Sequence, residues 1–260
     1  MRLHWELHPG EGSHLLLVHG FLTSQAQWML NLPALGEVCR PVTVELWGHG
    51  RSPSPEDPAC YAPEHYLEQF EQIRIELGAR RWDLLGYSLG AGLTIRYAMS
   101  HPERVTRHLF TNSISAFAPR AMSETWRRGG EQAAMNILAG GQTVMQRIAV
   151  HPRHARRLPD PVYRALMADA ELHQPLGIAN TVRYTTPEVS VRYELSGNST
   201  PALLLCGTRE KRFQPHREFV ETHMPNMRVA ELSAGHGVNM EAHGDFDRAV
   251  TGFISEGQRS

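Results

Sequence analysis

The sequence has few cysteines and no long apolar run. Its three cysteines, Cys39, Cys60 and Cys206, are an odd number, lie far apart and lack CxxC spacing. Such a set argues against a disulfide framework and against a cysteine zinc site. No apolar run approaches the roughly 20 residues of a membrane span, and Met1 opens into a mixed segment rather than a signal peptide. We therefore expect a cytoplasmic protein without a membrane span.

An excess of either charge is also missing. There are 26 basic and 27 acidic residues, a formal net charge of −1, which argues against a strong overall attraction to nucleic acid. Neither GxGxxG nor GxxxxGK[ST] occurs, and no His/Asp/Glu spacing suits a metal. We expect neither a cofactor nor a bound metal, and the sequence gives no sign of an oligomeric state.

What the sequence does contain is an alternation of short apolar runs with helical patterns. Continuous apolar runs without polar alternation are typical of parallel strands that are covered on both faces. Such runs predict strands at 15–18, 42–46, 82–86, 107–111, 202–207 and 228–232, and helices at 63–77, 89–99, 216–223 and 246–254. The order of these elements indicates βαβ units and hence an α/β fold.

The alternation stops between residues 116 and 196. Helical pieces are predicted there instead, at 122–138, 142–150, 161–171 and 176–185, with proline and glycine between them. We therefore predict a core formed by residues 1–115 and 197–260 and a helical cap or lid inserted at 116–196. We expect this cap to cover the carboxyl ends of the strands.

The sharpest local motif is Gly86-Tyr87-Ser88-Leu89-Gly90, which fits the G-x-S-x-G nucleophile elbow. In this turn the glycines allow a tight passage from strand to helix, and the serine Oγ stands exposed. The motif alone is weak, but a predicted strand precedes it and a predicted helix follows it. Ser88 is therefore the candidate nucleophile, and the alternative is an ordinary glycine-rich turn.

A serine nucleophile needs a base, and the base needs an acid that orients it. His236 follows the last predicted strand, a position where α/β sheets place ligands. Glu210 follows the strand at 202–207 and lies between Ser88 and His236 in the chain, as expected for an elbow serine. The alternative for Glu210 is a surface glutamate paired with Arg209 or Lys211.

An oxyanion hole needs backbone N–H donors near the nucleophile. We expect these donors at Leu89, directly after Ser88, and at Phe21, in the turn after the first apolar strand. His19 and Tyr87 adjoin these two segments and are candidate substrate-binding residues.

Five apolar residues of the cap are candidates for an acyl pocket, with packing inside the cap as the alternative: Met122, Trp126, Met135, Ile137 and Leu138. A basic run in the cap contains Arg147, His151, Arg153, His154, Arg156 and Arg157. It is interpreted either as a solvated face or as a rim that attracts an anionic substrate.

Several strings together resemble the α/β-hydrolase superfamily. They are Leu17-Val18-His19-Gly20-Phe21, Gly48-His49-Gly50-Arg51-Ser52, the elbow, His101-Pro102-Glu103-Arg104-Val105 and Gly235-His236. The resemblance implies a mostly parallel eight-stranded sheet with helices on both faces. It also implies Ser88 as nucleophile, His236 as general base and acid, and Glu210 as the third member.

Two reactions are compatible with this set. One is hydrolysis of a carboxylic ester or thioester of a small-molecule acyl substrate through an acyl-enzyme. The other is synthase or C–C bond chemistry on the same residues, because segments 19–24 and 205–213 resemble the menaquinone-pathway 2-succinyl-6-hydroxy-2,4-cyclohexadiene-1-carboxylate synthases. Those synthases usually carry an arginine two residues after the second elbow glycine, where this sequence has Gly92. A hydrolase fold without catalysis, used for binding, is a third hypothesis.

Overall fold

The computed structural model describes residues 1–195 and 198–256. In this part of the chain one seven-stranded sheet has the order β1-β3-β2-β4-β5-β6-β7. The short β1 pairs antiparallel with β3, and all other neighbours are parallel. The strands are β1 (Trp5–Leu7), β2 (His14–Val18), β3 (Arg40–Val44), β4 (Trp82–Gly86), β5 (Val105–Thr111), β6 (Ala202–Gly207) and β7 (Met227–Leu232).

The expectation of eight strands is thus wrong by one for the described residues. The antiparallel β1 was not predicted, because its three residues are only partly buried and give no apolar run. The strand predicted at 42–46 is β3, which begins at Arg40 and ends at Val44, two residues earlier than the apolar pattern indicated. The other predicted strands fall within a few residues of their observed bounds.

The apolar runs form strands because both faces of the sheet are covered. In β2 the side chains of Leu16 and Val18 pack against one set of helices, and those of Leu15 and Leu17 pack against the other. The first set comprises α2 (Pro63–Glu76) and α3 (Leu89–Ser100), and the second includes α1 (Leu32–Gly36) and α9 (His243–Glu256). All four β2 side chains have no exposed surface. This double burial explains the lack of polar alternation.

Shorter elements complete the core. They are α7 (Gln214–His223), α8 (Val238–Glu241) and the 3-10 turns η1 (Gln25–Trp28), η2 (Pro58–Tyr61) and η3 (Pro102–Arg104). No helix in the described ranges is long and apolar enough to cross a membrane.

The segment between β5 and β6 contains helices α4 (Arg120–Met145), α5 (Asp160–Ala170) and α6 (Pro175–Asn180), the 3-10 turn η4 (Pro152–His154) and the π turn η5 (Thr181–Thr185). The break predicted between the helices at 122–138 and 142–150 lies inside α4, where Gly141 has non-helical backbone angles (φ 53°, ψ −137°) and separates two helical pieces. The predicted end at residue 150 is wrong, because α4 ends at Met145.

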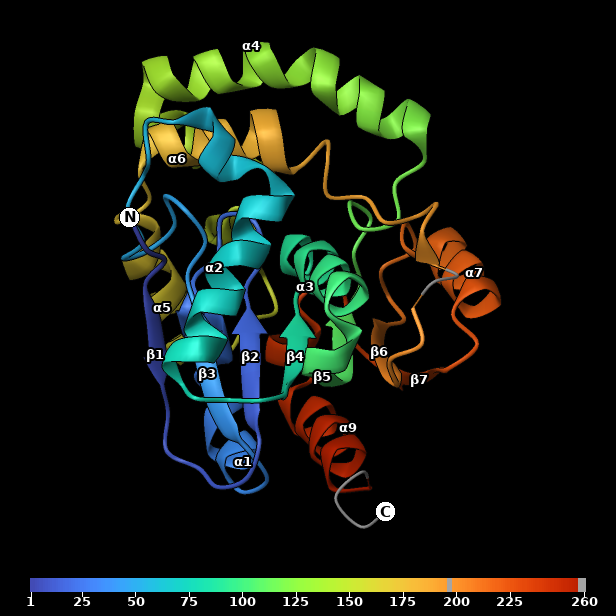
Figure 1. Ribbon diagram of the computed structural model, residues 1–260. Helices are drawn as coiled ribbons and strands as arrows, with labels where there is room; N and C mark the ends of the chain where they lie inside the picture. Colours follow the sequence, from blue (N-terminus) through green and yellow to red (C-terminus); the bar gives the residue numbers. More distant parts are fainter. Residues whose placement is uncertain (196–197, 257–260) are drawn as a thin grey trace.

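These helices do not all lie in one place. Figure 1 shows α4 running across the end of the sheet to which the strands point, with α6 beneath it. Helix α5 instead packs on the core, where Val162 and Leu166 join the cluster that contains Leu15 and Leu17.

A buried polar network ties α5 to the core. The Asp169 carboxylate accepts a hydrogen bond from Ser24 Oγ at 2.6 Å and two from Arg51, at 3.0 and 3.3 Å. Arg51 also contacts the buried carboxylate of Glu45. Because Ser24 and Arg51 belong to core loops, this network fixes the segment on the sheet.

Candidate active site

Ser88 lies in the turn between β4 and α3 in a strained conformation. Its φ of 53° and ψ of −114° place a non-glycine residue in a region that L-residues rarely occupy. The close packing of this turn requires a glycine at position 90, because a Cβ there would lie 2.5 Å from the carbonyl oxygens of Val18 and His19. The Ser88 N–H donates to Thr111 Oγ1 at 3.1 Å. Together these contacts hold the serine at the end of the sheet.

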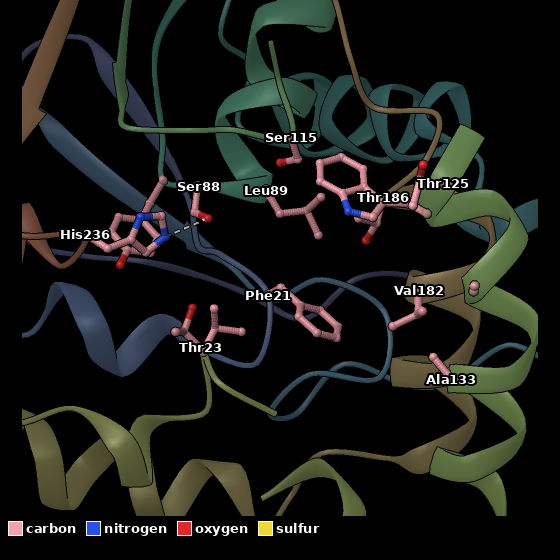
Figure 2. Close-up of a pocket in the computed structure, with 15 residues that line it drawn as sticks. Phe21, Thr23, Ser88, Leu89, Ser115, Thr125, Ala133, Val182, Thr186 and His236 are labelled. Atoms are coloured by element: carbon pink, nitrogen blue, oxygen red, sulfur yellow. Dashed lines mark hydrogen bonds between the residues drawn. The ribbon is translucent and has the colours of Figure 1, made fainter. Parts of the chain in front are cut away.

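Three side chains from three strand ends meet at this point. His236 Nε2 lies 2.9 Å from Ser88 Oγ, and His236 Nδ1 lies 3.0 Å from each carboxylate oxygen of Glu210. Figure 2 shows the contact between Ser88 and His236 at the edge of the pocket. An ionised carboxylate can only accept, so Nδ1 carries the proton and Nε2 accepts from the serine hydroxyl. The geometry is that of a nucleophile, a base and an orienting acid.

Glu210 is supported by a residue that sequence reasoning missed. Asn112 Nδ2 donates to Glu210 Oε2 at 2.7 Å, and the Asn112 amide also bonds the N–H and C=O of Gly207. Burial raises the pKa of Glu210, but the hydrogen bonds from His236 and Asn112 outweigh it, so the pKa lies below its ordinary value. The available sequence signal was the position of Asn112: it directly follows β5, which pairs with β6, the strand that precedes Glu210.

The turn after β2 lies directly against the elbow. A Cβ on Gly20 would come within 2.8 Å of the Tyr87 ring and 3.0 Å of Ser88 Cβ, so only glycine permits this approach. Within the described residues, the N–H groups of Phe21 and Leu89 have no protein acceptor. Leu89 is also the first residue of the 12-residue helix α3, whose N-terminus favours negative charge. An oxyanion formed at Ser88 would find donors here.

A cavity with two lobes opens at Ser88. The lobes share Ser88, His236, Tyr87, Trp126 and several small or apolar neighbours. The first, called the α4 lobe, has a volume of about 380 Å³ and reaches under α4; it adds Phe21, Leu89, Thr125, Gly129, Gly130, Ala133 and Val182. The second, called the histidine lobe, has a volume of about 480 Å³ and follows the loop of His236; it adds Glu210, Arg212, His151, His154, Met240 and Glu241 among others. Both volumes are in the usual range for small-molecule sites.

Not every predicted substrate-binding residue lines this cavity. Tyr87 and Trp126 do, and the Tyr87 ring packs edge-on against His236 with centroids 5.3 Å apart. His19 does not: it is fully buried, and its ring nitrogens bond the Gly20 carbonyl and the Leu46 N–H. Met122 also lies outside both lobes. The expectations for His19 and Met122 are therefore wrong.

Only some residues of the basic run in the cap line the cavity. His151 and His154 line the histidine lobe, whereas Arg153 donates to the side chain of Gln146 on the exposed surface. Of the other apolar candidates in α4, Met135 and Leu138 are exposed and Ile137 is buried, and none of the three lines either lobe.

Comparison with known proteins agrees with this architecture. The family described as alpha/beta hydrolase fold matches residues 13–242. The chain belongs to this family of α/β hydrolases.

A putative 2-succinyl-6-hydroxy-2,4-cyclohexadiene-1-carboxylate synthase of Bacillus subtilis (strain 168) is 23% identical over 254 residues, which cover 95% of this chain and 92% of that protein. Among solved structures, MenH from S. aureus superposes with a TM-score of 0.85 at 18% identity, covering 98% of this chain and 99% of that one. An enol-lactonase from Burkholderia xenovorans LB400 has a TM-score of 0.79 at 20% identity, covering 97% and 96%. At these identities the structural likeness shows the fold alone.

Proposed function

We propose that this protein is a serine hydrolase that cleaves a carboxylic ester or thioester of a small-molecule substrate through an acyl-enzyme. The observation that carries the proposal is the hydrogen-bonded chain from Ser88 Oγ through His236 to the Glu210 carboxylate, at 2.9 and 3.0 Å. A cavity adjoins the serine, and its α4 lobe is lined without Asp, Glu, Lys or Arg. A neutral acyl group suits such a wall.

In this proposal Ser88 Oγ attacks the acyl carbonyl while His236 Nε2 takes the hydroxyl proton. The negative charge that develops on the carbonyl oxygen accepts hydrogen bonds from the N–H groups of Phe21 and Leu89. Glu210 stabilises the imidazolium through Nδ1–H, and His236 then gives its proton to the leaving oxygen or sulfur. Water repeats the same steps on the acyl-enzyme and releases the acid.

A second candidate is elimination on the same three residues, as the name of the Bacillus subtilis relative suggests. The likeness over 95% of this chain favours it. The residue at one position is evidence against the elimination: those synthases usually carry an arginine there that holds a substrate carboxylate. Here that position is Gly92, which is buried in α3, and even a Cβ would lie 2.6 Å from Val189 Cγ2. An arginine side chain has no room at this place, and none of the residues lining the α4 lobe supplies a replacement cation.

The two candidates differ in whether a covalent intermediate forms. An ester hydrolase passes through an acyl-Ser88 species, whereas an elimination needs only proton transfer and departure of the leaving group. We expect rapid quenching with p-nitrophenyl acetate to give protein acetylated at Ser88 by mass spectrometry. Ser88→Ala should lower turnover by about 10⁶-fold while circular dichroism stays unchanged. Unchanged turnover in that variant would exclude the proposal.

A further inference from the structure

The two lobes of the cavity differ in charge. The α4 lobe contains no Asp, Glu, Lys or Arg side chain, and its walls are Phe21, Leu89, Trp126, Val182 and small residues of α4. The histidine lobe contains Glu210, Arg212 and Glu241, and also His151 and His154. An apolar group can therefore enter the first lobe at little cost in desolvation free energy, whereas a charged group there would be buried without a partner.

The chemistry at Ser88 assigns a part of the substrate to each lobe. The oxyanion donors Phe21 and Leu89 line the α4 lobe only, so the acyl carbon that carries the oxyanion lies at its entrance. His236 must protonate the leaving atom, and the lobe that continues along its loop, past Gly237 and Met240, is the histidine lobe. The acyl chain thus extends under α4, and the leaving group extends along the histidine loop.

Helix α4 lines its lobe mainly with small residues. Thr125, Gly129 and Ala133 are spaced four residues apart, so they share one stripe of the helix. All three line the lobe, and Figure 2 shows Thr125, Ala133 and Val182 across the pocket from Ser88 and His236. Gly129 is the middle of this stripe, and a Cβ built on it meets no heavy atom within 4 Å.

This glycine is not explained by backbone conformation. Gly129 lies inside α4 with helical geometry, and the left-handed residue of that helix is Gly141. Glycine is the weakest helix former after proline, so its presence here is unfavourable for α4 itself. Gly129 is exposed and lines the α4 lobe, so the open space at its Cβ adjoins that lobe. The neighbouring Gly130 has a different role, because a Cβ there would come within 3.3 Å of the Val182 carbonyl and disturb the packing of α4 on η5.

We propose that Gly129 sets the depth of an uncharged acyl subsite under α4, which makes the enzyme selective for medium-length, apolar acyl groups. This inference rests on the proposed hydrolase function and goes beyond it, because it assigns the acyl and leaving groups to separate lobes and names the residue that limits acyl length.

The test compares Gly129→Ala and Gly129→Leu with the wild type and with Gly252→Leu. Gly252 is a matched control, because it is an exposed glycine inside α9 whose Cβ also meets nothing within 4 Å, far from the cavity in sequence and lining neither lobe. Each protein is assayed for kcat/KM on p-nitrophenyl acetate, hexanoate and octanoate, on mono-p-nitrophenyl adipate, and on acetates of phenol and 2-naphthol. Thermal unfolding of each variant is measured in parallel.

We expect Gly129→Leu to lower the octanoate-to-acetate ratio of kcat/KM by at least tenfold, since one methylene of misfit in a pocket changes discrimination roughly 10- to 200-fold. Gly129→Ala should lower the ratio in the same direction by less, and Gly252→Leu should leave it unchanged. The naphthyl-to-phenyl ratio should stay constant in all variants, because the alcohol occupies the other lobe. The adipate should react at least tenfold more slowly than the hexanoate in the wild type.

An unchanged octanoate-to-acetate ratio in Gly129→Leu, or a loss confined to the naphthyl ester, would overturn the assignment of the lobes. An adipate as good as the hexanoate would overturn the uncharged character of the acyl subsite. A failure of the proposed function looks different: the wild type would neither hydrolyse any of these esters nor react at Ser88 with p-nitrophenyl alkylphosphonates. Phosphonate labelling at Ser88 with a chain-length profile unaffected by Gly129→Leu would leave the hydrolase standing and reject the subsite.

Discussion

Asn112 offers a direct test of how the triad is held together. Its side chain donates to Glu210 Oε2 at 2.7 Å and bonds both backbone groups of Gly207, at 3.0 and 3.1 Å. Asn112→Leu keeps the number and branching of the side-chain heavy atoms and removes all three bonds. A hydrogen bond to a charged group is worth about 1.5–3 kcal/mol. If this bond holds the carboxylate in place for the imidazolium, its loss corresponds to roughly a 10- to 150-fold fall in kcat/KM.

The same change also has a structural cost, which a control must separate. Unpaired buried groups on Gly207 should lower the free energy of unfolding by about 1–3 kcal/mol, out of the roughly 5–15 kcal/mol typical of a folded protein. Asn31→Leu is the matched control: Asn31 is also fully buried and donates to the Asn239 carbonyl and to Asp247, and none of its hydrogen bonds involves Ser88, Glu210 or His236. Urea unfolding and kcat/KM on p-nitrophenyl acetate are measured for both variants.

We expect both variants to lose stability and only Asn112→Leu to lose activity, mainly in kcat because no substrate contact is removed. If Asn112→Leu were destabilised to the same extent as Asn31→Leu and kept wild-type kcat/KM, the positioning role of Asn112 would be refuted. A fall in kcat/KM of equal size in both variants would point to a general loss of rigidity instead.

Three further predictions follow from the contacts described above. Glu210→Gln should lower kcat by roughly 10² to 10⁴, because it removes the charge that stabilises the imidazolium; a rate close to that of the wild type would reassign the orienting acid. Asp169→Asn should lower the free energy of unfolding by about 1–2 kcal/mol, a small value because Arg51 is partly exposed to solvent. Calorimetry should then show a Tm lower by about 2–8 °C. An unchanged Tm would mean that the network does not stabilise the contact of α5 with the core. Burial lowers the pKa of His108 to about 3, so below the ordinary value of 6.5 the unfolded chain takes up a proton that the folded protein does not. The contribution of neutral His108 to the free energy of unfolding is therefore fully present above pH 6.5. It is lost as the pH falls towards 3, by up to about 1.4 kcal/mol per pH unit. His108→Phe should make the fall in unfolding free energy between pH 6 and pH 4 shallower by about that slope, and an unaltered slope would show that another group takes up the proton.

The chemistry-bearing residues were readable from the sequence because each belongs to a local pattern. Ser88 lies in a five-residue motif, Glu210 follows a strand whose apolar run is continuous, and His236 follows the last predicted strand of the chain. A parallel sheet brings its carboxyl ends to one edge, so the order of strands and turns was enough to predict that these residues meet. The sequence left open whether Glu210 is the orienting acid or an ordinary surface glutamate. In the folded structure its carboxylate lies 3.0 Å from His236 Nδ1.

Other features depend on which side chains share a wall, and no local pattern reports this. His19 directly precedes the oxyanion turn, yet its ring faces into the protein and bonds Leu46 N–H at 2.9 Å. Met122 and Trp126 are one helical turn apart on α4, and only Trp126 reaches the cavity. For Asn112 the sequence offered only its position after a predicted strand, because its partner Glu210 lies 98 residues away and is brought close by the pairing of β5 with β6.

The sequence by itself therefore determined the α/β alternation, the strained serine turn and the three residues of the candidate triad, since these depend on periodicity and on short-range steric demands. The tertiary structure alone decided the number of strands, the placement of α5 on the core and the two-lobed shape of the cavity. It also gave Gly129 its significance: in the sequence it is one glycine of a helical stretch, and only the packing of α4 over Leu89 and Phe21 turns its missing side chain into space for a substrate. Burial and cavity shape arise from contacts between residues far apart in the chain, and a pattern of neighbouring residues does not encode them.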